Sequence, residues 1–244
     1  MTDVLASAAD WLGPDEWQAV ALSLQVALVA TLASLPLGLL TAYALARWRF
    51  PGHSVLNALV HLPLVLPPVV TGYLLLIGFG RQGPAGQFLQ ETFGLRLAFE
   101  WTGAALACAV MGFPLMVRAI RLAIEAVDEG LEEAAATLGA SRVWVLLTIT
   151  LPLAFSGIVA GTVLAFAKAM GEFGATITFV SNIPGRTQTI PSAIYAFLQV
   201  PSGEESAFRL IIVSIAVSVG AVLVAELLAR RTAHSIRRGI GGHR

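Results

Sequence analysis

Charge is scarce in this sequence. Of its 244 residues, 12% are Asp, Glu, Lys or Arg and 57% are hydrophobic, whereas a soluble domain carries about 25% charged residues. A chain with so few charges cannot hydrate the surface of a soluble protein of this length, so the composition indicates a membrane protein. The formal net charge is zero, so composition gives no reason to expect nucleic acid as a partner.

Cysteine and lysine each occur once. Cys108 alone excludes a disulfide within the chain, and its apolar neighbours predict a packed, unreactive thiol. Lys168 stands between two alanines, so the Gly-x-x-x-x-Gly-Lys-Ser/Thr loop that binds ATP is absent. The chain therefore cannot be an ATPase by itself.

Signatures of an enzyme or a metal site are also missing. Neither Gly-x-Ser-x-Gly nor His-Glu-x-x-His occurs in the sequence. The four histidines show no metal-ligand spacing; they are His53, His61, His234 and His243. We therefore expect no catalytic residue, no metal site and no cofactor in this chain.

The N-terminus lacks the positive charge with which a secretory signal peptide begins. It carries Asp3, Asp10, Asp15 and Glu16 instead. We therefore expect the first apolar run to stay in the protein as a membrane helix, preceded by an external tail over residues 1–16.

Five apolar runs are long enough to cross a bilayer. The hydrocarbon core is about 30 Å thick, and about 20 helical residues span it. The runs predict an all-α integral membrane protein with about five transmembrane helices, at residues 20–45, 55–79, 101–122, 153–180 and 208–229. The first and fourth runs exceed the required length, so we expect tilt or an exposed turn there.

Arginine in alternate connections predicts the orientation, because short cytoplasmic loops are enriched in Arg and Lys. The predicted cytoplasmic arginines are Arg47, Arg49, Arg118, Arg121, Arg142, Arg230, Arg231, Arg237 and Arg238. The opposite side holds Arg81, Arg96, Arg186 and Arg209 among acidic residues. The N-terminus is then outside and the C-terminus inside. Residues 230–244 form a basic cytoplasmic tail that sets orientation, and binding of membrane lipid is the second interpretation.

Prolines interrupt the second run. Pro67 and Pro68 lack the backbone N–H that a helix needs, and carbonyls freed at membrane depth are tolerated only against protein or a water-lined cavity. Candidates for a transport pathway or gate are therefore Pro67, Pro68, Thr71 and Gly72. An ordinary proline kink packed on a neighbour explains the same residues. His61 is expected to be a hydrogen-bonded interior histidine.

The fourth run contains Lys168 and Glu172, one helical turn apart. Charges inside a membrane are costly, usually paired and often functional. Lys before Glu is the weaker order for a helical pair, so we expect further partners. Gly171 and Gly174 bracket Glu172 and permit local unwinding. Lys168, Glu172 and Gly174 join the pathway candidates, with a buried pair that fixes helix packing as the competing interpretation.

The segment between the fourth and fifth runs predicts a turn and a short outer helix. Pro184-Gly185 is a turn signal. After Pro191, Ile194 and Phe197 recur at helical spacing. A structural cap with no role in transport accounts for this segment.

The connection over residues 128–150 is too polar to span a membrane. Asp128 is placed to cap a helix, and acidic residues follow in its first turns. Gly139 suits the stop of that helix, Ser141 can cap a second one, and Pro152 tolerates a place at the start of the fourth run. The connection therefore predicts a helix, a tight turn and a second helix exposed to the cytoplasm.

Here the sequence resembles the permease subunits of bacterial ABC importers. Those proteins carry Glu-Ala-Ala, three residues, Gly, nine residues, then Ile-x-Leu-Pro, and this chain matches every element: Glu133, Ala134, Ala135, Gly139, Ile149, Leu151 and Pro152, with Glu132 directly before them. The resemblance implies a type I importer permease fold over residues 17–229. It also implies docking of the loop on a separate ABC ATPase that binds ATP and Mg, a homodimer of permeases, and an external oxyanion-binding protein.

The resemblance extends to one branch of that family. Gly171 to Thr176 resembles the oxyanion permeases, and the stretches 62–72 and 177–195 resemble the molybdate permeases of a bacterial inner membrane. Sulfate, thiosulfate or tungstate is the alternative substrate within the same family. A gradient-driven secondary transporter that uses Lys168 and Glu172 as a relay is the alternative from a different class.

Overall fold

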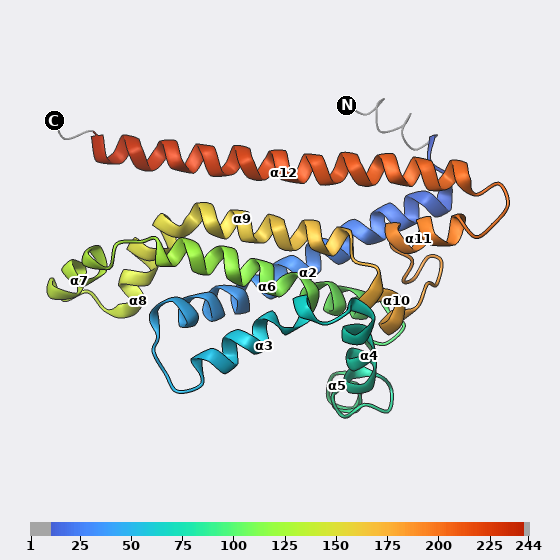
Figure 1. The fold of residues 1–244 in the computed structure, drawn as a ribbon, viewed down its shortest axis with the longest axis horizontal. Coiled ribbons are helices and arrows are strands. Elements are labelled where there is room, and N and C mark those ends of the chain that lie inside the picture. The colour runs from blue at the N-terminus through green and yellow to red at the C-terminus, as the bar shows by residue number, and fades with distance from the viewer. Residues whose placement is uncertain (1–10, 242–244) are drawn as a thin grey trace.

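The structure is a computed structural model that describes residues 11–241, without the side chains of residues 225, 226 and 228–241. Residues 1–10 of the predicted tail and the side chains of the basic tail lie outside the described residues. Within 11–241 every regular element is helical (Figure 1), as an all-α prediction requires. The predicted tail over 1–16 is corrected at its end, because Glu16 lies in the first turn of a helix and is buried.

The helices follow one another with short connections. Their bounds are α2 Pro14–Arg47, α3 His53–Val65, α4 Pro68–Phe79, α5 Pro84–Phe93, α6 Trp101–Glu125, α7 Glu129–Thr137, α8 Arg142–Val145, the π-turn η1 Leu146–Thr150, α9 Leu151–Met170, α10 Gly174–Val180, α11 Ile190–Phe197 and α12 Glu204–Gly241. Four helices are long and apolar enough to cross a membrane, and α3 with α4 makes a fifth if the bent pair is one span. The prediction of about five spans is confirmed in this sense.

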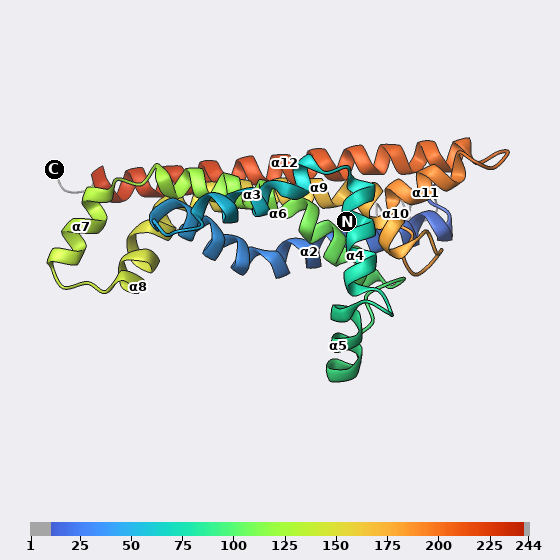
Figure 2. The ribbon, with the colours of Figure 1, turned by 60° about the horizontal axis from the view of Figure 1, so that its bottom comes forward.

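Helix α6 is the centre of the bundle. It packs against α2 and α9, and α12 lies along α9 (Figures 1 and 2). Small residues bring α6 and α9 together: a Cβ on Gly112 would lie 3.1 Å from the carbonyl oxygen of Ala165. Cys108 is buried in the same interface with its Sγ 3.5 Å from the carbonyl oxygen of Ala169, so the expected packed thiol is confirmed.

The second predicted span is not one continuous helix. Helices α3 and α4 meet at an angle of 114°. Leu66 is extended and Pro67 follows it, because a residue before proline avoids the helical conformation and proline cannot donate to the turn before it. Helix α3 runs along the bundle, whereas α4 turns away from the bundle axis and leads into α5, which was not predicted (Figures 1 and 2).

The fourth predicted span begins earlier and ends earlier than expected. Helix runs without a gap from Arg142 to Met170, so Pro152 does not start it. The π-turn η1 ends at Thr150, two residues before Pro152, and widens the helix there. This relieves the clash that proline makes with the carbonyl one turn back. At the other end the helix breaks over Gly171–Phe173 before α10.

The remaining helices agree more closely with the sequence. Helix α11 begins at Ile190, close to the predicted start after Pro191. Helix α12 starts at Glu204, four residues before the predicted start of the fifth span, and its backbone continues to Gly241. The pathway candidates therefore lie at the two breaks, which the bundle brings together because α4 packs against α10.

Candidate functional site

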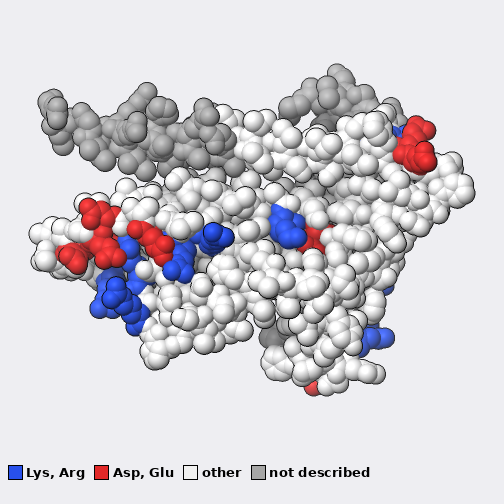
Figure 3. Space-filling model, in the orientation of Figure 1, with Lys and Arg blue, Asp and Glu red and all other residues white. Residues whose placement is uncertain are grey.

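The α7–α8 loop has the helix–turn–helix form that the sequence predicts. Asp128 accepts a hydrogen bond from the backbone N–H of Gly130 (2.8 Å), and Ser141 accepts one from the N–H of Trp144 (3.3 Å). Gly139 has φ +89°, a left-handed conformation that side chains with a Cβ rarely adopt. Figure 3 shows acidic and basic side chains gathered at this end of the molecule.

Arg47, the last residue of α2, fastens α7 to the bundle. Its side chain is 10% exposed, and its Nη2 donates to Oε1 of Glu132 (3.2 Å) and to the carbonyl of Val127 (2.9 Å). Its Nε lies 3.2 Å from Oε2 of Glu132, without hydrogen-bond geometry. Glu129 accepts from Nη1 at 3.1 Å, and the buried Thr150 donates to Glu132 at 2.7 Å. Because Arg47 and Glu132 are largely desolvated, each depends on the other for its charge to be tolerated.

The predicted coupling residues divide into an inner and an outer set. Glu132 faces Arg47, whereas Glu133 and Ala134 are exposed and Ala135 is half-buried. Ile149 and Leu151 are half-buried at the base of the loop, next to the exposed Pro152; these three residues belong to the π-turn and the start of α9. The exposed residues form the outer set. Large exposed apolar side chains lie around them: Leu131, Leu138, Val143 and Trp144, with Leu138 89% exposed. This surface has the composition of a protein interface.

The second predicted group, the pathway candidates, meets at the crossing of α4 and α10. A Cβ on Gly72 would lie 2.5 Å from the carbonyl oxygen of Ala175, and one on Gly174 would lie 2.7 Å from Cβ of Pro68. The two backbones can approach so closely only because both positions lack a side chain. The carbonyl of Pro67 accepts from the N–H of Thr71 at 3.2 Å. The side chain of Thr71 is buried here, and its hydroxyl has no hydrogen-bond partner among the described residues.

Glu172 occupies the break between α9 and α10. Its Oε2 lies 2.7 Å from Nζ of Lys168, and its Oε1 accepts from the N–H of Ala175 at 2.9 Å. The side chain of Glu172 is 1% exposed and that of Lys168 29%. The direct pair forms although Lys precedes Glu, and the further partner expected for it is the backbone at the start of α10. The carboxylate thus neutralises the only lysine and caps the helix after the break.

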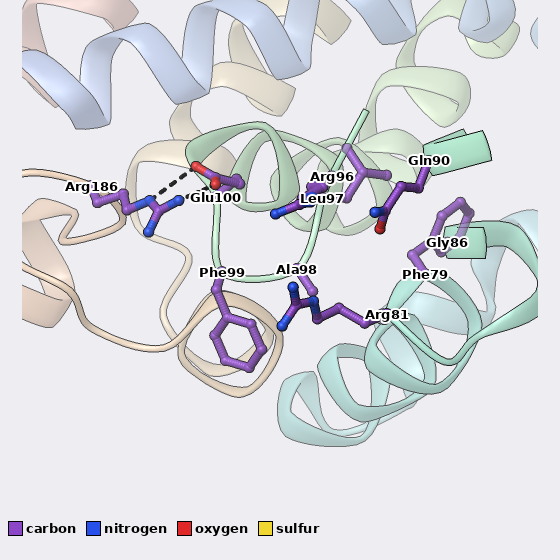
Figure 4. Close-up of a pocket in the computed structure, with 11 residues that line it drawn as sticks. Phe79, Arg81, Gly86, Gln90, Arg96, Leu97, Ala98, Phe99, Glu100 and Arg186 are labelled. Atoms are coloured by element: carbon purple, nitrogen blue, oxygen red, sulfur yellow. Dashed lines mark hydrogen bonds and ion pairs between the residues drawn. The ribbon is translucent and has the colours of Figure 1, made fainter. Parts of the chain in front are cut away.

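Three arginines on the predicted outer side line a cavity of about 200 Å³. Arg81, Arg96 and Arg186 line it with Glu100 and Gln90 (Figure 4). Arg186 donates from Nε to Glu100 Oε2 at 3.1 Å and from Nη2 to Oε1, and these bonds raise the pKa of Arg186. The signal available in the sequence was that all three arginines lie on loops next to the broken spans.

His61 lies on α3 and contacts the backbone of its own helix. Nδ1 of His61 lies 2.8 Å from the carbonyl oxygen of Asn57. Because a carbonyl only accepts, Nδ1 carries the proton, and the expected hydrogen-bonded histidine is confirmed. Among the side chains that the structure describes, no three of His, Cys, Asp or Glu form a group that could hold a metal ion.

Comparison with known proteins gives one family. Residues 34–234 match the model of the "binding-protein-dependent transport system inner membrane component". The molybdenum transport system permease protein ModB of Escherichia coli (strain K12) is 61% identical over 88% of this chain and 94% of its own length. ModB of Haemophilus influenzae is 53% identical, over 92% of this chain and 98% of its own length. The sulfate transport system permease protein CysT of Salmonella typhimurium is 37% identical, over 76% of this chain and 67% of its own length.

The fold is also found in solved structures. A bacterial ABC transporter that imports the acidic polysaccharide alginate superposes with a TM-score of 0.71 at 20% identity, over 90% of this chain and 80% of the other. At this identity the likeness concerns the fold, which is that of a type I importer permease.

The crossing of α4 and α10 gives a prediction for stability. Gly72→Ala should lower the free energy of unfolding by about 1–3 kcal/mol, because the added methyl group collides with the backbone of Ala175. Thermal unfolding of the detergent-purified protein measures the loss. Gly78→Ala is the control on the same helix, since no atom lies within 4 Å of the added Cβ. Equal unfolding midpoints for the two variants would contradict the tight crossing.

Proposed function

The chain belongs to the family of inner-membrane components of binding-protein-dependent transport systems, and we propose from this that it is the permease subunit of an ATP-driven importer of molybdate. It is a multi-pass protein of the inner membrane and a transport subunit without an ATPase site of its own. The observation that supports molybdate as the substrate is the 61% identity to a molybdenum permease along nearly its whole length, against 37% to a sulfate permease.

The outer set of the α7–α8 loop is the docking surface for the ATPase. Glu133, Ala134 and Leu138 are exposed on a helix that Arg47 and Glu132 hold to the bundle. A partner bound to the exposed face therefore moves α2 and α9 together with the loop. The Arg47–Glu132 ion pair joins α2 to α7, and the hydrogen bond from Thr150 to Glu132 joins α7 to the helix that leads into α9. ATP and Mg belong to that partner. ATP biases transport because it binds with different affinity to the two states of the complex.

The pathway runs past the two broken helices. Two copies of the chain form it about a two-fold axis, with the crossing of α4 and α10 as the gate in each copy. Lys168 supplies positive charge to an anion within the membrane, and Glu172 keeps that charge tolerable until the anion arrives. An external binding protein delivers the oxyanion at the end opposite α7. The N-terminus is then outside and the C-terminus inside.

Uptake of labelled molybdate by cells that lack this chain, with and without the chain restored, tests the substrate. We expect uptake that requires the chain and persists in excess unlabelled sulfate. Competition by tungstate shows whether that ion shares the route, since it has the same shape and charge. Uptake that sulfate abolishes would identify a sulfate permease, and uptake that never requires the chain would contradict a role in molybdate import.

Substitution of Gly139 tests the coupling role of the loop. Gly139→Val forces a branched side chain into the left-handed region at a cost of about 1–2 kcal/mol, which distorts the turn between α7 and α8. We expect ATP hydrolysis by the reconstituted complex to continue while molybdate carried per ATP falls at least fivefold. Gly52→Val is the matched control, because Gly52 has φ +98° in open space outside the loop. Equal transport ratios in the two variants would refute the coupling role.

Variants of the Lys168–Glu172 pair separate a pathway role from a packing role. Lys168→Gln leaves a fully buried carboxylate without its cation, at a cost of about 3 kcal/mol. The double variant Lys168→Gln with Glu172→Gln removes both charges, and its amide oxygen can still accept from Ala175. We expect the double variant to regain thermal stability in detergent while uptake stays below a tenth of the normal rate. Uptake that returns together with stability would leave the pair a packing role alone.

A further inference from the structure

The arginine-lined cavity lies beside α4 and α5, away from the α7–α8 loop (Figure 1). Four segments meet there: the end of α4 with Arg81, the helix α5 with Gln90, the residues before α6 with Arg96 and Glu100, and the α10–α11 loop with Arg186. In Figure 4 the Arg81 side chain extends towards Ala98 and Phe99, on the loop that also carries Arg96. Arg81 and Arg96 lie 15 residues apart, and the distant Arg186 joins them at one cavity of about 200 Å³.

The charge around this cavity is unbalanced. Three arginines and one carboxylate line it, which leaves a formal charge of +2. Glu100 is already engaged by two nitrogens of Arg186. Among the described residues Arg81 and Arg96 form no ion pair, so their positive charges remain available to a ligand. Phe79, Leu97 and other apolar residues form part of the wall beside the three solvent-exposed arginines, and the unpaired guanidinium groups attract an anion from solution.

Close backbone packing gives the cavity a fixed frame. A Cβ on Gly86 would collide with the carbonyl oxygens of Gly80 and Phe79, and one on Gly103 would collide with that of Leu97. The start of α5 is therefore pressed onto the end of α4, and the loop before α6 is pressed onto α6. The backbone that carries the arginines therefore needs little rearrangement when a ligand binds.

We propose that this cavity, the arginine pocket, is a binding site for one tetrahedral oxyanion of charge −2 at the outer entrance of the permease. Guanidinium groups donate paired hydrogen bonds to such oxygens, and the Gln90 amide adds a neutral donor. The pocket holds the cargo between its release from the binding protein and the opening of the gate. This inference rests on the proposed import of molybdate. A phosphate of a lipid headgroup has the same chemistry and is the other source of an occupant.

Equilibrium binding to the purified permease tests the pocket without the ATPase or the binding protein. Calorimetric titration with sodium molybdate in detergent should show one saturable site per chain. Arg81→Gln with Arg96→Gln should weaken binding at least tenfold. Arg49→Gln with Arg118→Gln is the matched control, because it removes two exposed arginines outside the pocket and should change affinity less than twofold. Tungstate should compete with molybdate, since it has the same shape and charge.

Titrations in nanodiscs of different lipid composition show whether the occupant is a free oxyanion or a lipid phosphate. Equal molybdate affinity in detergent and in nanodiscs containing phosphatidylglycerol supports the free oxyanion as occupant. Affinity lost in those nanodiscs and kept in zwitterionic ones would assign the site to lipid phosphate and overturn the entrance role. No binding by the unaltered protein, or equal weakening in the two double variants, would overturn the site itself. Chain-dependent uptake in cells that persists despite such a result leaves the proposed function standing, so the two failures are distinguishable.

Discussion

The ion pair between Arg47 and Glu132 is the contact on which the rest of the arrangement depends. It joins the end of α2 to α7, and Thr150 extends it to the helix that leads into α9. Each of the two charges is nearly removed from water, so loss of Arg47 would leave Glu132 without its cation at a cost of about 3–5 kcal/mol. The exposed residues of the loop can serve a partner because this hidden pair holds their helix in place.

The breaks in the helices follow a second constraint, the lack of water in a bilayer. Backbone groups released by Pro67 and by Gly171–Phe173 have to be satisfied inside the protein. Glu172 meets one such need by accepting from Ala175, and the carbonyl of Pro67 meets another by accepting from Thr71. The two breaks lie against each other because glycines allow α4 and α10 to touch. Irregular backbone is thereby confined to one place, which is where a gate can form.

The sequence predicted the spans, the capped loop and the residues at both breaks, because apolar length, proline and helix caps act locally. It could not predict the 114° turn between α3 and α4, since proline ends a helix without specifying where the chain goes next. Glu132 stands beside Glu133 in the sequence, and only the fold decides that one faces Arg47 while the other faces out. The arginine pocket was missed for the same reason, because only the fold brings Arg186 to the segment over 79–100.

The unbroken helix from Arg142 to Met170 is stiff enough to carry a displacement along its length. Its 29 residues span about 44 Å at 1.5 Å per residue, which exceeds the thickness of the hydrocarbon core. A continuous ladder of hydrogen bonds resists compression, so a push at α8 is delivered to the far end of the rod. The helix first breaks there at Gly171–Phe173, where Glu172 accepts a hydrogen bond from the N–H of Ala175 at the start of α10. A displacement of α8 by a partner would therefore reach this break, and the chain would bend there.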